Sequence, residues 1–437
     1  MTDTSRRDFL QRTAAATAAL GLAPGLAHGS EVSFDPEPVP EGLPRAPLGP
    51  DDPVRIGIIG TGGMGTGHLE AFVKAAQEGR TNMVVAAGAD VCDKRVAQAK
   101  EKAEAVQGPG TMDSYRDYRE LLKRPDLHGV LIAAPEHWHA KIAEDAILAG
   151  KDVYVEKPMT YDLKAALRLW DVQRKHPDRI VNVGTQYVMT PSYRNARQWI
   201  ADGKIGKPVW SQTSYCRNSK EGEWLYYAID PEWQPGVNLD WDAWCGPSGK
   251  APWSPEVYAR WRRYKRYSTG IIGDLLVHRI TPLLACMDLG WPIRVTGAGG
   301  HYIDKAMENH DQVNLTIEFE NEHTMIVAGS TGNEVGLETM IRGHKGNFYL
   351  GGRNAILRPE RLFAEEVEEQ TIVGEDHGDD QDALRLRWLE CIRTREPAPS
   401  PVELGTKVMV IVDLAARSMW EGGAFGYDPV KRKVKRL

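Results

Sequence analysis

Cysteine is scarce in this sequence, with five residues in 437. They are scattered singly, and their odd number leaves at least one without a partner in the chain. None belongs to a CxxC pair or to another spacing typical of metal ligands, so the sequence predicts no cysteine metal site. We expect all five to behave as small, partly buried apolar side chains: Cys92, Cys216, Cys245, Cys286 and Cys391.

Long apolar runs and dense basic patches are also absent. No run approaches the roughly 20 residues that cross a bilayer, so we expect no membrane partner. The net charge is −6, and no basic patch is dense enough to suggest nucleic acid. Hydrophobic residues make up 42% and charged residues 26%, as in ordinary soluble globular proteins. A length of 437 residues suffices for two domains with extra segments.

The first 29 residues have the pattern of a targeting signal rather than of a folded segment. Paired arginines, Arg6 and Arg7, are followed by Phe9 and Leu10 and then by a weakly apolar run too short to span a membrane. This pattern resembles a twin-arginine export signal, a pathway that carries folded proteins, and it predicts a periplasmic protein. The alternative is a disordered basic tail.

A proline-rich arm follows over residues 30–52. Seven prolines between positions 34 and 53 exclude a helix or a central strand and favour an extended chain. The arm is either a spacer or a segment that lies on a neighbouring subunit.

A dinucleotide fingerprint comes next. The apolar run 54–59 predicts a strand, which leads into a G-x-G-x-x-G turn, and helical apolar spacing resumes after it. In such a turn the first glycine permits the bend, the second admits the pyrophosphate, and the third packs helix against strand. The N–H groups at the helix N-terminus then face the phosphates. We expect cofactor contacts from the whole turn: Gly60, Gly62, Gly63, Met64 and Gly65.

A second predicted strand, 83–89, ends at Asp90, 25 residues after Gly65. An acidic side chain at that distance binds the adenosine ribose hydroxyls and repels a 2′-phosphate, which favours NAD over NADP. The nearby Lys94 and Arg95 keep NADP possible.

Strands and helices continue to alternate. Strands are predicted at 130–134 and 152–155, with a helix over 140–149 between them. This order predicts a doubly wound parallel sheet, and we place a Rossmann domain at residues 53–185.

Four segments carry a family resemblance: PEHWHA (135–140), EKPM (156–159), LDWDAWCGP (239–247) and GIIGDLLVH (270–278). With the fingerprint, they resemble an exported bacterial branch of the Gfo/Idh/MocA family of NAD(P)-dependent sugar and polyol oxidoreductases. The resemblance implies a second, α+β domain at 186–437, with an open and mostly antiparallel sheet that covers the nicotinamide and helps to form a homo-oligomer, a dimer or tetramer. It implies three catalytic residues, Lys157, Asp274 and His278. It also implies cofactor contacts from Pro135, His139, Glu156 and Lys157.

The spacing of Asp274 and His278 is compatible with that role. Four residues apart in a helical pattern over 271–288, they share one face, where the carboxylate can orient the imidazole and raise its basicity. The alternative is an ordinary structural pair. Pro282 removes the helical bond to the His278 carbonyl, so we expect a kink or break just after the histidine.

Two residues depart from the family pattern. Leu276 stands where the family has glycine, and Thr281 where many members have a further acid. Leu276 either narrows the pocket or faces the core. His137 and His139 form an HxH pair, but no third ligand is identifiable by spacing, and we predict no metal site.

The segment 217–268 is rich in tryptophan and tyrosine and is interrupted by proline and glycine. It predicts a long ordered loop. Its rings either stack on sugar faces, with interleaved basic residues binding hydroxyls or a carboxylate, or form a satellite cluster or an oligomer interface. The basic residues are Arg217, Lys220, Arg260, Arg262 and Arg263.

Beyond this loop, strands are predicted at 313–319 and 324–328, and a helix at about 403–420 should pack back on the body. The basic residues 431–437 are expected to form a solvated tail.

These features predict a dehydrogenase that acts on a secondary hydroxyl of a sugar, sugar acid or polyol with a tightly held NAD. In this hypothesis His278 takes the hydroxyl proton, Lys157 binds the same oxygen, and Asp274 orients His278. One alternative is a glycoside hydrolase that uses NAD transiently in oxidation, elimination and re-reduction. The hydrolases of that type carry Tyr-Pro-Thr-His where this chain has Leu-Leu-Val-His (275–278). Another is a non-catalytic sugar-binding relative.

Overall fold

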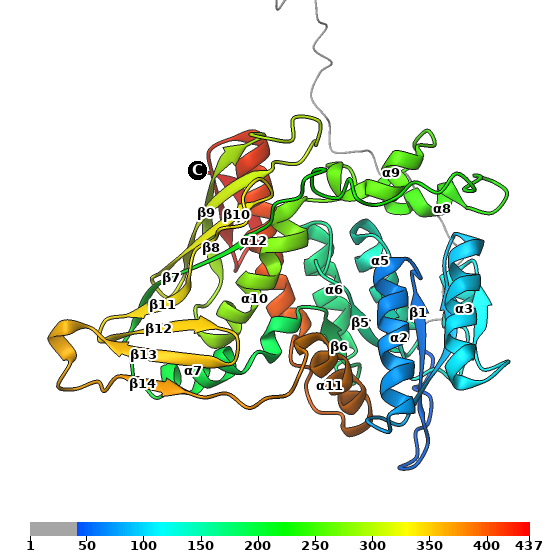
Figure 1. Cartoon of the computed structure of the whole chain (residues 1–437), viewed down its shortest axis with the longest axis horizontal. Helices are drawn as coiled ribbons and strands as arrows, with labels where there is room; N and C mark the ends of the chain where they lie inside the picture. The colour runs from blue at the N-terminus through cyan, green and yellow to red at the C-terminus, as the bar shows by residue number, and fades with distance from the viewer. Residues whose placement is uncertain (1–41) are drawn as a thin grey trace, which may run out of the picture. The chain divides into compact units, whose positions relative to one another are not determined.

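The computed structural model describes residues 42–437 (Figure 1). The twin-arginine segment (1–29) and the first part of the proline-rich arm (30–41) lie outside the described residues. Within residues 42–437, no helix is both long enough and apolar enough to cross a membrane. All five cysteines are free thiols, and four of them are buried, as the sequence predicts.

The first domain is a parallel sheet of six strands in the order β3-β2-β1-β4-β5-β6. The strand order reverses beside β1, and open α/β sheets bind ligands at such a point. The predicted Rossmann fold is confirmed. The strands are β1 (Val54–Ile59), β2 (Met83–Ala89), β3 (Asp113–Tyr115), β4 (Gly129–Ile132), β5 (Asp152–Val155) and β6 (Val181–Val183). The helices that follow them are α2 (Gly63–Gln77), α3 (Asp93–Gln107), α4 (Tyr118–Leu122), α5 (Glu136–Leu148) and α6 (Leu163–Lys175).

Helix α5 begins at Glu136, four residues before the predicted start at 140. Residues 135–139 lie between the predicted strand and the predicted helix. Pro135 is instead the residue before the helix, where its missing N–H costs nothing, and the following polar side chains are buried in the first turn. The PEHWHA segment is therefore a helix start rather than a loop.

A late helix, α11 (Asp380–Thr394), packs on the first domain although it lies far beyond that domain in the chain. Its Trp388 is fully buried against Phe72 of α2 and Tyr154 of β5, with ring centroids 6.3 and 5.6 Å apart. Sequence analysis did not predict this helix. The first domain's core therefore includes residues outside the predicted range 53–185.

Residues 42–52 of the proline-rich arm lie on their own chain. The Pro47 carbonyl is 3.0 Å from Nε2 of His128, and Arg45 donates a hydrogen bond of 2.6 Å to the carbonyl of Ile392. This part of the arm thus packs on its own chain.

The second domain contains a mixed sheet of ten strands in the order β14-β13-β12-β11-β7-β10-β9-β8-β15-β16. Only the β10–β7 pair is parallel, so the prediction of an open, mostly antiparallel sheet is confirmed. The strands are β7 (Pro208–Cys216), β8 (Pro292–Gly300), β9 (Gln312–Phe319), β10 (His323–Ser330), β11 (Thr339–Gly343), β12 (Gly346–Gly351), β13 (Asn354–Pro359), β14 (Gln370–Ile372), β15 (Ala424–Asp428) and β16 (Lys433–Arg436).

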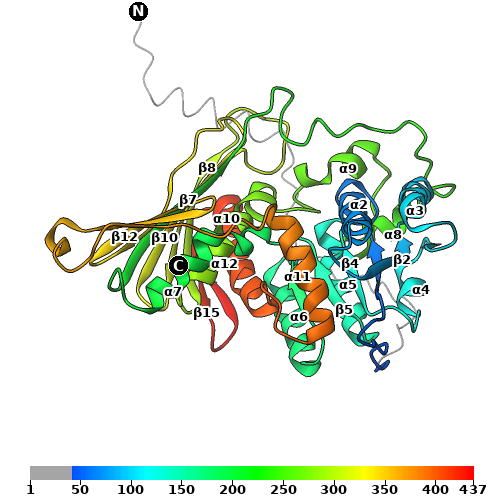
Figure 2. The ribbon, with the colours of Figure 1, turned by 60° about the horizontal axis from the view of Figure 1, so that its bottom comes forward.

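Helices cover one face of this sheet, on the side of the first domain (Figures 1 and 2). The longest, α12, confirms the predicted helix at 403–420 and packs on β8 and α6. The other strand prediction, at 313–319 and 324–328, is confirmed by β9 and β10. The helices are α7 (Pro191–Ala201), α10 (Val277–Cys286) and α12 (Val402–Glu421).

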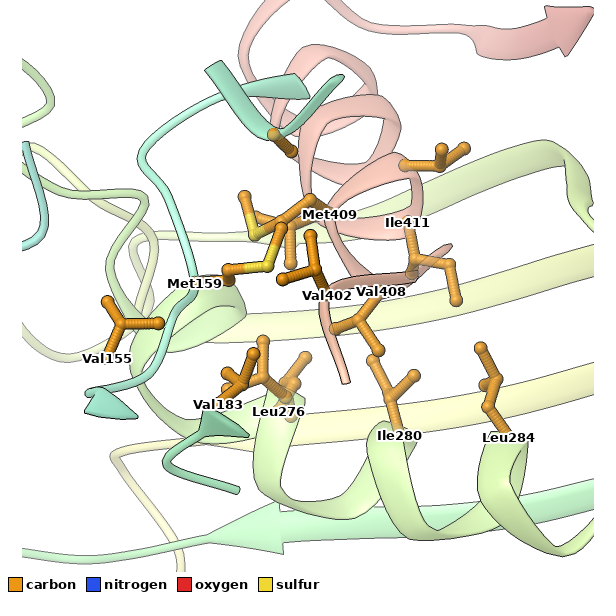
Figure 3. Packing of buried hydrophobic residues seen from close by; sticks show 14 of the residues in the cluster. Val155, Met159, Val183, Leu276, Ile280, Leu284, Val402, Val408, Met409 and Ile411 are labelled. Carbon is orange, nitrogen blue, oxygen red and sulfur yellow. The ribbon is translucent and has the colours of Figure 1, made fainter. Parts of the chain in front are cut away.

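Leu276 faces the core and not the pocket. Figure 3 shows Leu276, Ile280 and Leu284 pointing from one side of their helix toward α12. Leu276 is fully buried, and its Cδ2 would lie 2.9 Å from a Cβ placed on Gly329 of β10. The leucine in place of the family's glycine therefore fills space between helix and sheet, and it does not narrow the site.

The basic residues 431–437 do not form a free tail. Residues Lys433–Arg436 form the edge strand β16, which pairs with β15. Alternation of exposed lysine and arginine with a partly buried Val434 suits such an edge, where charge discourages further pairing.

Candidate active site

The glycine-rich turn has the geometry that a dinucleotide needs. Gly60 has a positive φ of 87°, and a Cβ there would lie 2.5 Å from the backbone nitrogen of Ala134. A Cβ on Gly65 would lie 1.8 Å from the Gly60 carbonyl oxygen. Both positions therefore exclude any side chain. By contrast, Gly63 would meet no atom of the described residues within 4 Å, so the outer side of the turn is open.

The N-terminus of α2 is left uncapped beside that open space. The N-cap residue is Gly62, which has no side chain to cap the helix, and the first turn of α2 carries no acidic residue. Unpaired N–H groups with the positive end of the helix dipole form an anion site, here at the position of a pyrophosphate. Met64, at 42% exposure, lies on the outside of this turn. The turn thus fits the phosphates of a dinucleotide.

Asp90 lies at the end of β2, next to the same turn. One of its carboxylate oxygens accepts from the Thr61 N–H at 2.8 Å and the other from the Cys92 N–H at 2.9 Å. Burial raises the pKa of Asp90, and the charge of Arg95 partly offsets this. The carboxylate is held where the fingerprint predicts the ribose hydroxyls.

The two basic residues that kept NADP possible already have partners. Lys94 donates to the carboxylate of Asp230 at 2.8 Å and to that of Glu232. The Arg95 guanidinium lies 4.6 Å from the ring centroid of Tyr258 and 5.4 Å from that of Trp233. Both side chains therefore have partners within the protein instead of standing free to bind a 2′-phosphate.

The sequence-predicted catalytic residues come together from both domains. Lys157, just after β5, donates from Nζ to Oδ1 of Asp274 at 2.9 Å and to the Asp274 carbonyl at 3.0 Å. Arg262 donates from Nε to the same Oδ1 at 2.8 Å. Burial alone would raise the pKa of Asp274, but Arg262 and Lys157 outweigh it and hold this pKa well below its usual range. Asp274 is therefore a charged, buried anchor for two cations.

The prediction that Asp274 orients His278 is wrong for this arrangement. The hydrogen bonds of the Asp274 carboxylate go to Lys157 and Arg262, and Nδ1 of His278 has no partner among residues 42–437. Sequence spacing could not show this, because Arg262 reaches the carboxylate from the aromatic segment. Asp274 instead positions Lys157.

His278 is an uncharged imidazole between two tyrosines. Its ring centroid lies 5.8 Å from that of Tyr187 and 6.0 Å from that of Tyr215. Burial lowers the pKa of His278 to about 3, and the charge of Lys157 adds to the effect, while Asp274 acts in the opposite direction. Neither tyrosine belongs to a recognised motif, so neither could be predicted from the sequence.

The helix is irregular before His278 and not after it. Residues Ile272–Leu276 form a π-helical turn that leads into α10, and α10 continues through Pro282 without a break. The break expected after His278 is thus absent, and the π turn carries Asp274 into the site instead. Such turns are common at functional sites.

Glu156 and His139 are buried and form hydrogen bonds with residues around the site. Glu156 is buried and accepts from Nε2 of His68 at 2.9 Å; His68 in turn accepts from Arg385 of α11 at 2.8 Å. Burial would raise the pKa of Glu156, but the His68 hydrogen bond together with the nearby charges of His68, Lys157 and His278 outweighs burial and lowers this pKa to about 2. His139 lies 2.7 Å from the carbonyl oxygens of Pro158 and Ala134. Cofactor contacts from these two residues and from Pro135 stay predictions.

His137 and His139 both contact backbone carbonyl groups. The Nε2 atom of His137 lies 2.8 Å from the Trp244 carbonyl oxygen, and both ring nitrogens of His139 lie 2.7 Å from carbonyl oxygens. No group of three potential ligands occurs among residues 42–437.

Sequence analysis missed a buried acid beside this site. Glu136 is fully buried, and its Oε1 accepts from the Thr269 N–H at 2.8 Å, while Oε2 has no partner among the described residues. Burial, with the nearby charge of Asp274, raises the pKa of Glu136 to about 8. The only feature of the sequence that pointed to Glu136 was its place as an acidic residue near the start of the PEHWHA segment.

The aromatic segment is mainly a satellite cluster. Four buried rings pack against one another and against the edge of the first domain, and four partly buried rings pack on them. Tyr226 and Tyr227 are instead exposed, by 47% and 40%, and Arg262 lies 5.8 Å from the Tyr227 ring. The buried rings of the cluster are Trp241, Trp244, Tyr258 and Tyr267, and the partly buried ones are Trp233, Trp253, Trp261 and Tyr264.

The fold and the site together define a two-domain dinucleotide-binding protein in which the second domain brings an aspartate and a histidine to a lysine of the first. The chain belongs to the Gfo/Idh/MocA oxidoreductase family: residues 54–185 match its NAD-binding Rossmann fold and residues 248–427 its C-terminal alpha/beta domain. The bound cofactor of this family's Rossmann domain is NAD, as the sequence predicts.

Two curated relatives are similar to this chain over a little under two fifths of its length. Inositol 2-dehydrogenase/D-chiro-inositol 3-dehydrogenase of Lactiplantibacillus plantarum is 31% identical over 170 residues, 39% of this chain and 46% of the relative. Levoglucosan dehydrogenase of Pseudarthrobacter phenanthrenivorans is 30% identical over 167 residues, 38% of this chain and 41% of the relative. The chain thus matches about half the length of these relatives.

A solved structure extends the likeness of fold to most of the chain. A levoglucosan dehydrogenase in complex with NADH and levoglucosan superposes with a TM-score of 0.66 over 86% of this chain and 99% of the other. Its sequence identity is 20%, so this comparison concerns the fold alone.

Proposed function

We propose that this protein transfers hydride between a tightly held NAD and a secondary hydroxyl of a sugar, sugar acid or polyol. The observation that carries the proposal is the meeting of Lys157, Asp274 and a neutral His278 at the carboxyl end of β5. The open glycine turn follows β1, which is separated from β5 only by β4 in the sheet. This turn supplies a site for the phosphates of the cofactor. The curated relatives, named as inositol and levoglucosan dehydrogenases, support this substrate class.

The protein's own groups divide the work around the reacting hydroxyl. NAD, when bound, supplies the carbon that accepts the hydride. His278, uncharged above a pH of about 3, accepts the hydroxyl proton. Lys157 donates a hydrogen bond to the same oxygen and stabilises its developing negative charge. Asp274 and Arg262 fix the Lys157 ammonium group in place.

We also propose that the protein acts in the periplasm. The twin-arginine pattern at Arg6 and Arg7 supports export of a folded, cofactor-loaded protein. Replacing both arginines with lysine should leave the protein in the cytoplasmic fraction of a cell, and unchanged periplasmic recovery would contradict the export proposal. A homo-oligomer, a dimer or tetramer, stays a prediction that light scattering can check.

The enzyme assay can distinguish dehydrogenase from hydrolase. Cofactor-loaded protein is mixed with inositol, levoglucosan, free sugars, sugar acids and aryl glycosides. A lasting rise in absorbance at 340 nm with a polyol or sugar is the expected result. Release of the aryl group without lasting reduction of the cofactor would support the hydrolase alternative, and no response to any compound would contradict both.

A further inference from the structure

The aromatic segment docks on the first domain immediately after Asp90. We call residues 230–260, which include the short helices α8 (Trp241–Cys245) and α9 (Pro255–Arg260), the strap. The Asp93 N–H donates to the Asn238 carbonyl at 3.0 Å, and the Asp240 N–H donates to the Val91 carbonyl at 2.9 Å. Cys92 and Leu239 form an antiparallel bridge between them. In Figures 1 and 2 the strap's helices lie beside α2 and α3.

Side chains reinforce this backbone contact. The Lys94 ammonium group is shared by Asp230 and Glu232 of the strap. Arg116, which follows β3, donates to the Val237 carbonyl at 3.2 Å. The strap is therefore tied both to the segment after β2 and to the segment after β3.

Arg95 links the strap to the glycine turn. Its guanidinium faces the rings of Trp233 and Tyr258 and lies 3.5 Å from where a Cβ on Gly62 would be. The carboxyl ends of β2 and β3 are where a Rossmann domain receives the adenosine half of its cofactor, next to the phosphate-binding turn. The strap thus stands at the adenosine end of the site.

A second anchor lies at the start of α5. The Trp138 Nε1–H donates to the Trp244 carbonyl at 2.8 Å, and Nε2 of His137 lies at the same distance from that oxygen. Gly246 approaches the Trp138 ring so closely that a Cβ would lie 2.0 Å from it. Fixed at both places, the strap cannot move aside without separating its buried rings from the first domain.

From this geometry we infer that the strap is a wall of the cofactor site, which encloses the adenosine half of NAD and slows its release. The inference rests on the proposed function. Residues 186–247, which include the first part of the strap, lie between the two regions that match the family. That first part of the strap, with Trp233 and Leu239, therefore adds to the cofactor site a contact that lies outside both matched regions.

The test measures cofactor release from the full-length protein. Protein loaded with NAD is mixed with an excess of 3-acetylpyridine adenine dinucleotide, and the NAD set free is followed by chromatography. Trp233→Ala removes one ring facing Arg95, and Lys94→Gln removes the shared ion pair. We expect Trp233→Ala to release NAD about tenfold faster, since desolvated cation–π contacts reach that size, and Lys94→Gln to have a smaller effect in the same direction.

Lys250→Gln is the matched control. Lys250 pairs with Asp242 at 3.0 Å in the same strap, but both side chains are exposed. Its release rate should equal that of the wild type. Hydrogen exchange on the unaltered protein adds a test that needs no variant: the amides of Asp93 and Asp240 should exchange more slowly with NAD than without it.

The outcomes separate the two proposals. Equal release rates in wild type, Trp233→Ala and Lys94→Gln, with amide exchange indifferent to NAD, would overturn the strap inference and leave the proposed function standing. A wild-type protein that takes up no NAD would overturn both.

Discussion

The two ends of the cofactor site are built in different ways. The phosphate end is made by a six-residue turn in which Gly60 and Gly65 are dictated by close backbone contacts. The reacting end is made by Lys157 and Asp274, 117 residues apart, and by Arg262 from a third segment. The phosphate end works because its glycines carry no side chains. The reacting end works because the buried charge of Asp274 is balanced by Lys157 and Arg262. The comparison teaches that binding and chemistry should be separable by mutation.

The largest effect is expected from His278→Ala. Without the imidazole that accepts the hydroxyl proton, turnover should fall about 10³-fold, within the usual range for general-base removal. NAD content should stay unchanged, because His278 lies at the reacting end. Steady-state assays and chromatography of released cofactor measure the two quantities. His344→Ala, at an exposed position, should change neither. Loss of NAD from His278→Ala would show that the two ends are not separable.

Lys157→Met should lower turnover about 10²-fold, as expected for loss of one charged donor to the reacting oxygen. Because the charge of Lys157 adds to burial in lowering the pKa of His278, its removal should raise that pKa from about 3 toward the ordinary value. The acidic limb of the pH profile for kcat/KM should move to higher pH. A limb that stays in place would mean that Lys157 does not act on His278.

A pair of alanine substitutions tests the phosphate end. Gly65→Ala forces a Cβ into the Gly60 carbonyl and should destabilise the fold by about 1–3 kcal/mol, with loss of NAD. Gly63→Ala meets no described atom and should keep its stability, but its methyl group occupies the open side of the turn and should weaken NAD binding. Thermal melting and isothermal titration measure these changes. Equal melting temperatures for the two variants would contradict the account of the turn.

Glu136→Gln should change stability rather than turnover, and the size of the change depends on pH. The pKa of Glu136 is raised to about 8 in the folded protein, above its unfolded value, so the folded state retains this proton longer. The group's contribution to stability is therefore lost as pH rises from about 4.5 to about 8. The glutamine variant lacks this loss and should gain stability relative to wild type between pH 5 and pH 8. A stability difference that does not change with pH would contradict this assignment.

Local features of the sequence predicted much of the fold. Strand 54–59, the glycine turn and Asp90 could be placed because each depends on residues close in the chain. The strands 313–319 and 324–328 followed from their alternation, which reflects one covered face. The start of α5 was misplaced because its buried polar residues resemble a loop.

Contacts between distant segments could not be predicted. The partner of Asp274 was wrong because Arg262 reaches the carboxylate through a loop whose path the sequence does not reveal. The burial of Trp388 on the first domain, and the docking of the strap after Asp90, have the same origin. The spacing of residues showed which of them share a helix face. It could not show which charged side chains from other segments would pair with them.

Transfer of deuterium tests the central claim most directly. Cofactor-loaded protein is mixed with a polyol that carries deuterium on its hydroxyl-bearing carbons and that raises the absorbance at 340 nm. Mass spectrometry of the released cofactor then shows whether the label has moved. The account predicts one deuterium on the reduced nicotinamide ring. A reduced cofactor without deuterium would contradict direct hydride transfer at the site of Lys157 and His278.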